Sequence, residues 1–312
     1  MPEIMENETD FKSLVNQSIA TTVAGRIKNL SFKNPILIGG CGSSGTTLLK
    51  TILDSHKNIA CGPEIWFFDH PRLYQIKLED LYRMFIEQDF SEMNEGLTTP
   101  LKTQYKDTFG LFAPNYARLF HNFAEINQMF ELAENTRHFL DIFFSTYADR
   151  SGKTRWAEKT PNNVFCIEEI LSFWDTAKFV HVIRDGRDVA LSLKNSREYD
   201  IYTAAIRWKL ATEAGIRMRG NWRYYEIRYE DLILNTEDCL HKLCGFLEED
   251  FDPRMLNFEK AGKDNPMNYG STPIHAKSIG KWKRPKTNPI DLKILDLALR
   301  DQLEKLDYNW NE

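Results

Sequence analysis

Glycine and hydroxyl residues follow one short apolar run, and this combination is typical of a loop that binds phosphate. The apolar run is Ile36–Ile38, the loop extends from Gly39 to Gly45, and from Thr46 onward apolar residues recur at helical spacing. Glycines let a backbone close around an anion, and a helix N-terminus adds unpaired N–H groups and the positive end of the helix dipole. The sequence therefore predicts a phosphate site made by a strand, a loop and a helix.

The loop nearly matches the nucleotide-triphosphate pattern G-x-x-x-x-G-K-[ST], but Thr46 stands in place of the lysine. That lysine normally reaches the β- and γ-phosphates, and the hydroxyl after it holds Mg²⁺. The loop is therefore suited to bind a phosphate and poorly suited to triphosphate chemistry. A P-loop kinase-like phosphotransferase is one alternative interpretation, and a glycine-rich structural turn without a ligand is another.

A second phosphate site is predicted where the apolar stretch 177–183 ends. Arg184 follows that stretch, and Ser192 lies two helical turns further along the chain. An arginine at a strand end and a hydroxyl on the following helix can hold a phosphate. The alternative is local: Arg184 forms an ion pair within the turn, while Arg187 and Asp188 are solvated charges at the start of a helix.

Strands that alternate with helices must position these two sites. We expect strands at 36–38, 58–61, 177–183 and 224–229, and helices at about 10–24, 46–56, 163–174, 202–218, 236–247 and 290–306. This alternation predicts a parallel sheet with helices on both faces. Ligands of such sheets collect at the carboxyl ends of the strands. The segments that follow the predicted strands there are 39–47, 62–66, 184–192 and 229–231.

The length of 312 residues suits one large α/β fold. We predict a single P-loop-like domain over residues 1–312, with a central parallel sheet flanked by helices. Residues from about 70 to 150 form a helical stretch rich in aromatic side chains, which we interpret as an insertion that caps the substrate. Most of these aromatic side chains are expected in the core.

Composition narrows the classes of partner. A net charge of −5 argues against general binding of nucleic acid or of anionic membranes. The five cysteines are odd in number and lack paired metal spacing, which indicates reduced, mostly buried thiols. The polar start has no signal-peptide pattern, and no apolar run is long enough to span a bilayer. We therefore expect a cytoplasmic protein without a nucleic-acid, membrane or metal partner, and leave a homodimer open.

Together the two phosphate motifs resemble those of the sulfotransferases that use 3′-phosphoadenosine 5′-phosphosulfate (PAPS). The loop from Gly40 to Thr47 is similar to that family's 5′-phosphosulfate loop, and the stretch from Phe179 to Ser192 is similar to its 3′-phosphate motif. The likeness covers roughly residues 34–68 and 155–285. It is closest in detail to the tyrosylprotein and related bacterial branch, through the stretches Cys61–Glu64, Glu158–Pro161 and Lys281–Trp282.

The resemblance implies that the donor is PAPS, that the product is PAP, and that no metal takes part. Arg184 and Ser192 would hold the 3′-phosphate, Tyr229 would lie near the adenine, and Lys281 would contact donor phosphates. Backbone N–H groups and hydroxyls of the loop would hold the 5′ end, through Gly42, Ser43, Ser44, Gly45, Thr46 and Thr47.

The resemblance also implies in-line transfer of a sulfuryl group to a hydroxyl acceptor, which is a phenol, a peptide tyrosine or a small molecule. Glu64 would be the general base, Lys159 would contact the transferring group, and Ser271 would be a hydroxyl ligand. One position departs from the family, because Ser43 stands where relatives usually carry Arg or Lys. Lys159 is the first candidate to replace that cation. A non-catalytic protein that binds PAP or another nucleotide is the alternative that Ser43 leaves open.

Overall fold

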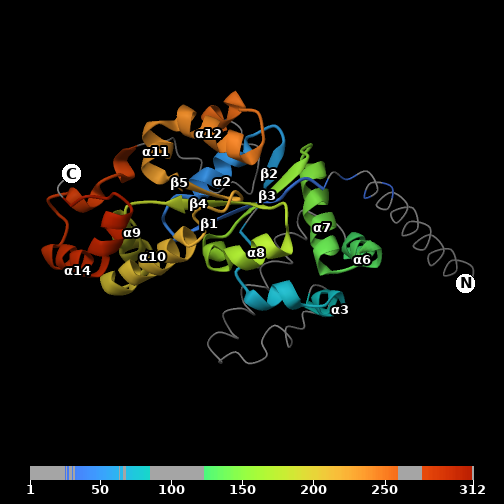
Figure 1. The fold of residues 1–312 in the computed structure, drawn as a ribbon, viewed down its shortest axis with the longest axis horizontal. Helices are drawn as coiled ribbons and strands as arrows, with labels where there is room; N and C mark the ends of the chain where they lie inside the picture. Colours follow the sequence, from blue (N-terminus) through green and yellow to red (C-terminus); the bar gives the residue numbers. More distant parts are fainter. Residues whose placement is uncertain are drawn as a thin grey trace, which may run out of the picture. The chain divides into compact units, whose positions relative to one another are not determined.

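The computed structural model describes residues 25, 27, 30, 32–62, 64–65, 68–84, 123–258 and 276–310. The chain falls into two compact units. The smaller unit contains residues 1–33 and 71–156, and the larger contains residues 34–70 and 157–312. Figure 1 colours the described residues along the chain.

A five-stranded sheet forms the centre of the larger unit. Its strand order is β2-β3-β1-β4-β5, so β1 lies between β3 and β4. The pairs β1–β3, β1–β4 and β4–β5 are all parallel, and Ile36 lies opposite both Ala157 and Lys178. The strands are β1 (Ile36–Gly40), β2 (Ile59–Cys61), β3 (Arg155–Lys159), β4 (Lys178–Ile183) and β5 (Tyr224–Arg228).

Helices cover both faces of this sheet, as Figure 1 shows for α2 and α12 on one face and α8 and α10 on the other. The main core lies under α2, α11 and α12, where fully buried side chains such as Leu49 and Leu243 pack on Ile38 and Val180. The α-helices of this unit are α2 (Thr46–Asp54), α8 (Ile167–Phe173), α9 (Gly186–Arg197), α10 (Ile201–Ile216), α11 (Tyr229–Leu234), α12 (Thr236–Leu247) and α14 (Pro289–Lys305). Its 3₁₀ turns are η3 (Pro161–Cys166), η4 (Pro253–Asn257), η6 (Ala276–Ser278) and η7 (Lys281–Lys283).

The described part of the smaller unit is helical. It contains η1 (Pro71–Gln75), α3 (Leu78–Tyr82), α6 (Phe123–Leu132) and α7 (Thr136–Arg150). Phe130 of α6 stacks on Phe139 of α7 at 3.8 Å between ring centroids, and Arg150 forms an ion pair with Glu125. Its aromatic residues therefore build a core, as predicted. A role as a substrate cap, and a single domain over 1–312, stay predictions.

The fold class is confirmed as a parallel sheet flanked by helices, with three local corrections. The prediction lacked β3, whose residues Arg-Trp-Ala-Glu-Lys are too polar to look like a buried strand, yet all five are buried. The segment predicted as one helix over 163–174 divides into η3 and α8. The strand predicted to end at 229 ends at Arg228, and Tyr229 begins α11. The helix predicted at 10–24 lies outside the described residues.

Candidate active site

Three of the predicted site segments lie at the carboxyl ends of neighbouring strands. The glycine loop follows β1, Lys159 is the last residue of β3, and Arg184 follows β4. Because β3, β1 and β4 are adjacent and parallel, these ends meet at one edge of the sheet. Glu64, which follows β2, belongs to the same edge, because its carboxylate forms an ion pair with Lys159.

The loop has the backbone of an anion cradle. Ser43 and Gly45 both adopt the left-handed conformation, with φ of 67° and 99°, and Gly45 is the N-cap of α2. No side chain caps this helix, so the first-turn N–H groups remain available to a ligand. The Ser44 hydroxyl is buried and has no hydrogen-bond partner within the described segments. A buried, unsatisfied hydroxyl beside free helix N–H groups suits an anionic ligand.

The Tyr229 ring packs against this loop at Gly45. A Cβ atom at Gly45 would lie only 2.3 Å from the Tyr229 ring, so glycine is required for close packing as well as for its positive φ. The Tyr229 ring also lies 4.6 Å from the Arg184 guanidinium, in a cation–π contact. Tyr229 therefore joins the two predicted phosphate sites, and its contact with an adenine stays a prediction.

Glu64 and Lys159 form the second part of the site. The Lys159 side chain is only 3% exposed, while that of Glu64 is 31% exposed, so the carboxylate faces partly into solvent. Lys159 Nζ also donates to Thr47 Oγ1 at 3.2 Å. One ammonium group therefore connects the predicted base with the first turn of α2.

Glu158 is a functional candidate that sequence reasoning left among flanking residues. It is fully buried, and it accepts hydrogen bonds from Thr160 Oγ1 at 2.7 Å and Asn163 Nδ2 at 2.6 Å. Asn163 Nδ2 also donates to the Ile38 carbonyl at 3.3 Å, which ties the end of β3 to β1. Burial raises the pKa of Glu158 to about 7. Its place beside Lys159 was visible in the sequence, but its burial and its bonds to Thr160 and Asn163 were not.

Arg184 contacts the cradle directly. Its Nη1 donates to the Ser43 carbonyl at 2.9 Å and its Nη2 to the Ser278 carbonyl at 2.5 Å. The Nε atom is buried and has no partner among the described residues. A buried guanidinium with an unused donor is suited to a phosphate oxygen. The alternative of solvated charges after it is wrong, because Arg187 and Asp188 are both buried.

The remaining predicted ligands are placed less closely. Ser192 is half-buried on α9, and no hydrogen bond of its hydroxyl is found within the described part of the chain. Lys281 lies in η7, where burial, and after it the charges of Arg184 and Arg284, lower its pKa. Lys281 therefore belongs to the Arg184 side of the site. Ser271 lies outside the described residues.

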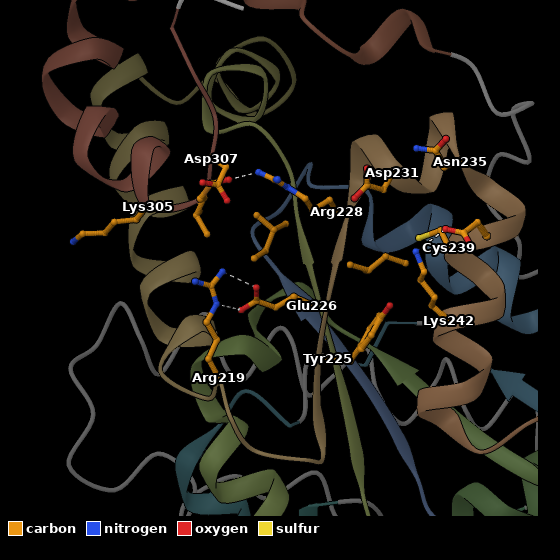
Figure 2. Close-up of a pocket in the computed structure, with 14 residues that line it drawn as sticks. Arg219, Tyr225, Glu226, Arg228, Asp231, Asn235, Cys239, Lys242, Lys305 and Asp307 are labelled. Carbon is orange, nitrogen blue, oxygen red and sulfur yellow. Dashed lines mark hydrogen bonds and ion pairs between the residues drawn. The ribbon is translucent and has the colours of Figure 1, made fainter.

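A separate groove of about 460 Å³ follows the outer edge of β5. Figure 2 looks onto this edge, with Arg219 and Glu226 on one side of the strand and Lys242 on the other. None of the predicted site residues lines it. Charged side chains along the open edge of a sheet discourage pairing with another chain, which accounts for the charges in this lining. We therefore assign the groove no part in the site.

Other features of the described residues bear on the predicted partners. All five cysteines are buried free thiols. Residues 32–62, 123–258 and the other described segments hold no group of three or more metal-ligating His, Cys, Asp or Glu residues. In the same segments, no helix has the length and apolar character needed to cross a membrane. Metal independence, cytoplasmic location and a homodimer stay predictions.

The family model and the two relatives described next are all sulfotransferases by description. A family model described as "Sulfotransferase family" matches residues 35–253. The protein-tyrosine sulfotransferase of Drosophila melanogaster is 22% identical over 268 residues, which cover 79% of this chain and 46% of the relative. Protein-tyrosine sulfotransferase A of Caenorhabditis elegans is 22% identical over 296 residues, which cover 88% of this chain and 67% of the relative.

Solved structures show the same fold. The sulfotransferase domain from the curacin biosynthetic pathway is 18% identical to this chain, with a TM-score of 0.54 and coverage of 89% of this chain and 98% of that domain. At this identity the likeness concerns the fold alone. The chain spans about half the length of the fly relative, so the activity of that whole protein is not carried over to it directly.

Proposed function

The chain belongs to the sulfotransferase family, and on that premise we propose that it moves a sulfuryl group from PAPS to a hydroxyl acceptor. The proposal rests on the contact between Arg184 and Ser43, because this contact joins the two predicted phosphate sites into one. PAPS carries a phosphosulfate at one end and a 3′-phosphate at the other. A donor with two anionic ends fits a site that offers helix N–H groups at one place and a buried guanidinium at the other.

Unsatisfied polar atoms support the fit of this donor. The Ser44 hydroxyl and the Arg184 Nε atom are both buried without a partner among the described residues, and both lie at the carboxyl edge of the sheet. A buried polar group without a hydrogen bond is costly, by about 1–3 kcal/mol each, so such groups call for a ligand that supplies acceptors. The residues proposed to hold PAPS are Gly42, Ser43, Ser44, Gly45, Thr46, Thr47, Arg184, Ser192, Tyr229 and Lys281.

Glu64 and Lys159 are proposed to act where the sulfuryl group is transferred, Glu64 on the acceptor and Lys159 on the transferring and leaving groups. PAPS supplies an activated sulfuryl group when bound. Glu64 accepts the proton of the acceptor hydroxyl at a carboxylate oxygen, and its partial exposure leaves room for that hydroxyl to approach. The Lys159 ammonium, held beside Thr47, places positive charge where negative charge develops.

The position of Lys159 also bears on the serine at position 43. The Ser43 carbonyl accepts a hydrogen bond from Arg184, so this residue contributes backbone rather than a charged side chain. Lys159 is the cation that donates directly to the first turn of α2. We therefore assign to Lys159 the leaving-group stabilisation that relatives obtain from an Arg or Lys of the loop. Non-catalytic binding of PAP is the alternative that this assignment must exclude.

The acceptor is proposed to be a phenolic hydroxyl. The names of two relatives state that they act on protein tyrosine, which makes peptide tyrosine the first acceptor to test. The relatives are 22% identical, so a small phenol is tested beside it.

The experiment measures sulfuryl transfer from radiolabelled PAPS to 4-nitrophenol and to a tyrosine peptide flanked by acidic residues. Binding of PAP and of Mg·ADP is measured in parallel by calorimetry, with and without EDTA. We expect PAP to bind more tightly than ADP without Mg²⁺, and label to appear on an acceptor. Tight Mg·ADP binding would favour the kinase-like alternative. PAP binding without transfer to any acceptor would favour the non-catalytic one.

A further inference from the structure

A turn far along the chain is anchored on the residues that follow β4. This turn, Ser278–Trp282, contains Lys281 and connects η6 to η7. The residues that anchor it form the charged run Arg184-Asp-Gly-Arg-Asp188, which begins before α9 and ends inside its first turn. About 90 residues separate the two segments in sequence, so the sequence alone gives no sign of their contact.

Asp188 makes the central contact with this turn. It is fully buried, its Oδ2 accepts the Gly280 N–H at 2.7 Å, and its Oδ1 accepts the Trp282 N–H at 3.0 Å. These two amides flank Lys281 on either side. The two carboxylate oxygens therefore hold the backbone before and after the lysine, at Gly280 and at Trp282, and so fix the lysine within the turn.

The other charged residues of the run contact the same turn. Arg184 donates to the Ser278 carbonyl, and its Nη2 lies 3.7 Å from Asp188 Oδ2. Asp185 Oδ2 accepts the indole N–H of Trp282 at 3.1 Å. The Arg187 guanidinium stacks on the Trp282 ring at 3.7 Å. The run is thus a docking element as well as a source of Arg184.

We propose that Asp188 is a positioning residue, which holds the Ser278–Trp282 turn so that Lys281 joins Arg184 as a second cation for the 3′-phosphate of the donor. The inference rests on the proposed function and extends it to the selection of donors with a 3′-phosphate. It assigns to Asp188 no contact with the donor, because both carboxylate oxygens are already used by the turn.

Electrostatics separates this role from simple fold support. Arg184 donates to the Ser278 carbonyl of the turn that contains Lys281. Burial, and after it repulsion from Arg184, lowers the pKa of Lys281. A fold has no need to bring two cations together. An anion between them would turn the repulsion into two favourable contacts. Asp188, at 3.7 Å from Arg184, reduces the repulsion while no anion is bound.

The experiment compares the affinities of PAP and adenosine 5′-phosphate, which differ in the 3′-phosphate, for the wild type, Asp188→Asn and Lys281→Ala. Asp188→Asn replaces one acceptor oxygen by an NH₂ group that faces a backbone N–H. We expect both variants to bind PAP at least about tenfold more weakly, since hydrogen bonds to charged groups are worth that much or more. Binding of adenosine 5′-phosphate should change less than about threefold. The double variant should bind PAP no more weakly than the single variant with the lower affinity, because both substitutions remove the same contact.

Asp252→Asn is the matched control. Asp252 is a buried carboxylate that also accepts two backbone amides, from Lys57 at 2.8 Å and Arg254 at 3.0 Å, but it lies at η4, away from the site. It should lower the melting temperature and leave the ratio of the two affinities unchanged.

Equal losses for both nucleotides, or additive losses in the double variant, would show Asp188 to be structural and overturn the inference. If Asp188→Asn does not fold, Lys281→Ala decides, and an unchanged ratio in that variant overturns it. A wild type that does not prefer PAP would instead overturn the proposed function, and this inference with it.

Discussion

Lys159 is the residue whose removal most directly tests how the site works. Its side chain is 3% exposed and contacts both Glu64 and Thr47, so Lys159→Met removes one charge and keeps most of the buried volume. A preorganised donor in a water-excluded site contributes about 2.7–4 kcal/mol to the barrier, which corresponds to 10²–10³ in rate. We therefore expect turnover to fall by about 10²–10³ while the affinity for PAP changes less than about fivefold.

Stability must be measured beside the rate, because removing one partner of a fully buried ion pair costs about 3–5 kcal/mol. Glu64 is partly exposed and can turn to solvent, so the loss in Lys159→Met should be smaller than that. The control is Lys178→Met. Lys178 is 4% exposed and pairs with the exposed Glu248 at 2.9 Å, but it begins β4, at the end opposite Arg184.

The assay is single-turnover transfer at saturating PAPS, with melting temperatures and PAP titrations for both variants. Lys178→Met should lose stability and keep its rate per folded molecule. If the turnover rate of Lys159→Met is within about threefold of the wild type, Lys159 does not replace the cation that the loop lacks at position 43. If both variants lose the same rate, the effect is one of folding rather than of charge at the site.

Three further substitutions test separate parts of the site. Glu64→Gln should leave PAP affinity nearly unchanged and cut single-turnover rates by roughly 10²–10⁴, and a near-normal rate in a well-folded variant would end its role as base. Arg184→Ala should weaken PAP far more than adenosine 5′-phosphosulfate, measured by calorimetry, because only PAP carries the 3′-phosphate; equal losses would indicate a structural arginine. Gly45→Ala must place a Cβ atom 2.3 Å from the Tyr229 ring at a φ of 99°. Overpacking and left-handed strain together should lower the free energy of unfolding, measured with denaturant, by about 2–5 kcal/mol. A loss under about 1 kcal/mol would contradict this account of the loop.

The parts of the site that sequence could predict are those encoded by adjacent residues. The loop from Gly39 to Gly45 ends in a glycine, and at that residue the structure shows a left-handed turn and close packing against the Tyr229 ring. Strand, loop and helix follow one another without interruption, so their geometry depends little on the rest of the chain. The same holds for Arg184, which the apolar run of β4 places at the sheet edge.

The parts that sequence could not predict depend on partners distant in the chain. β3 contains Arg155, Glu158 and Lys159, and nothing local indicates that these charges are buried. Their burial is tolerated because Glu158 is bonded to Thr160 and Asn163, and Lys159 is paired with Glu64. A strand whose polar groups are satisfied by tertiary contacts does not show the apolar run by which buried strands are usually identified.

The cations that we propose to contact the donor also connect the segments that build the site. Arg184 donates to Ser43 of the cradle and to Ser278 of the distant turn, while its Nε has no partner in the part of the chain that the structure describes. Lys159 likewise connects the predicted base with the first turn of α2. Each cation contacts two segments. A shift in one segment therefore moves the cation relative to the other segment. The serine at position 43 is consistent with this arrangement, since a cation supplied by a sheet strand is held more rigidly than one supplied by the loop itself.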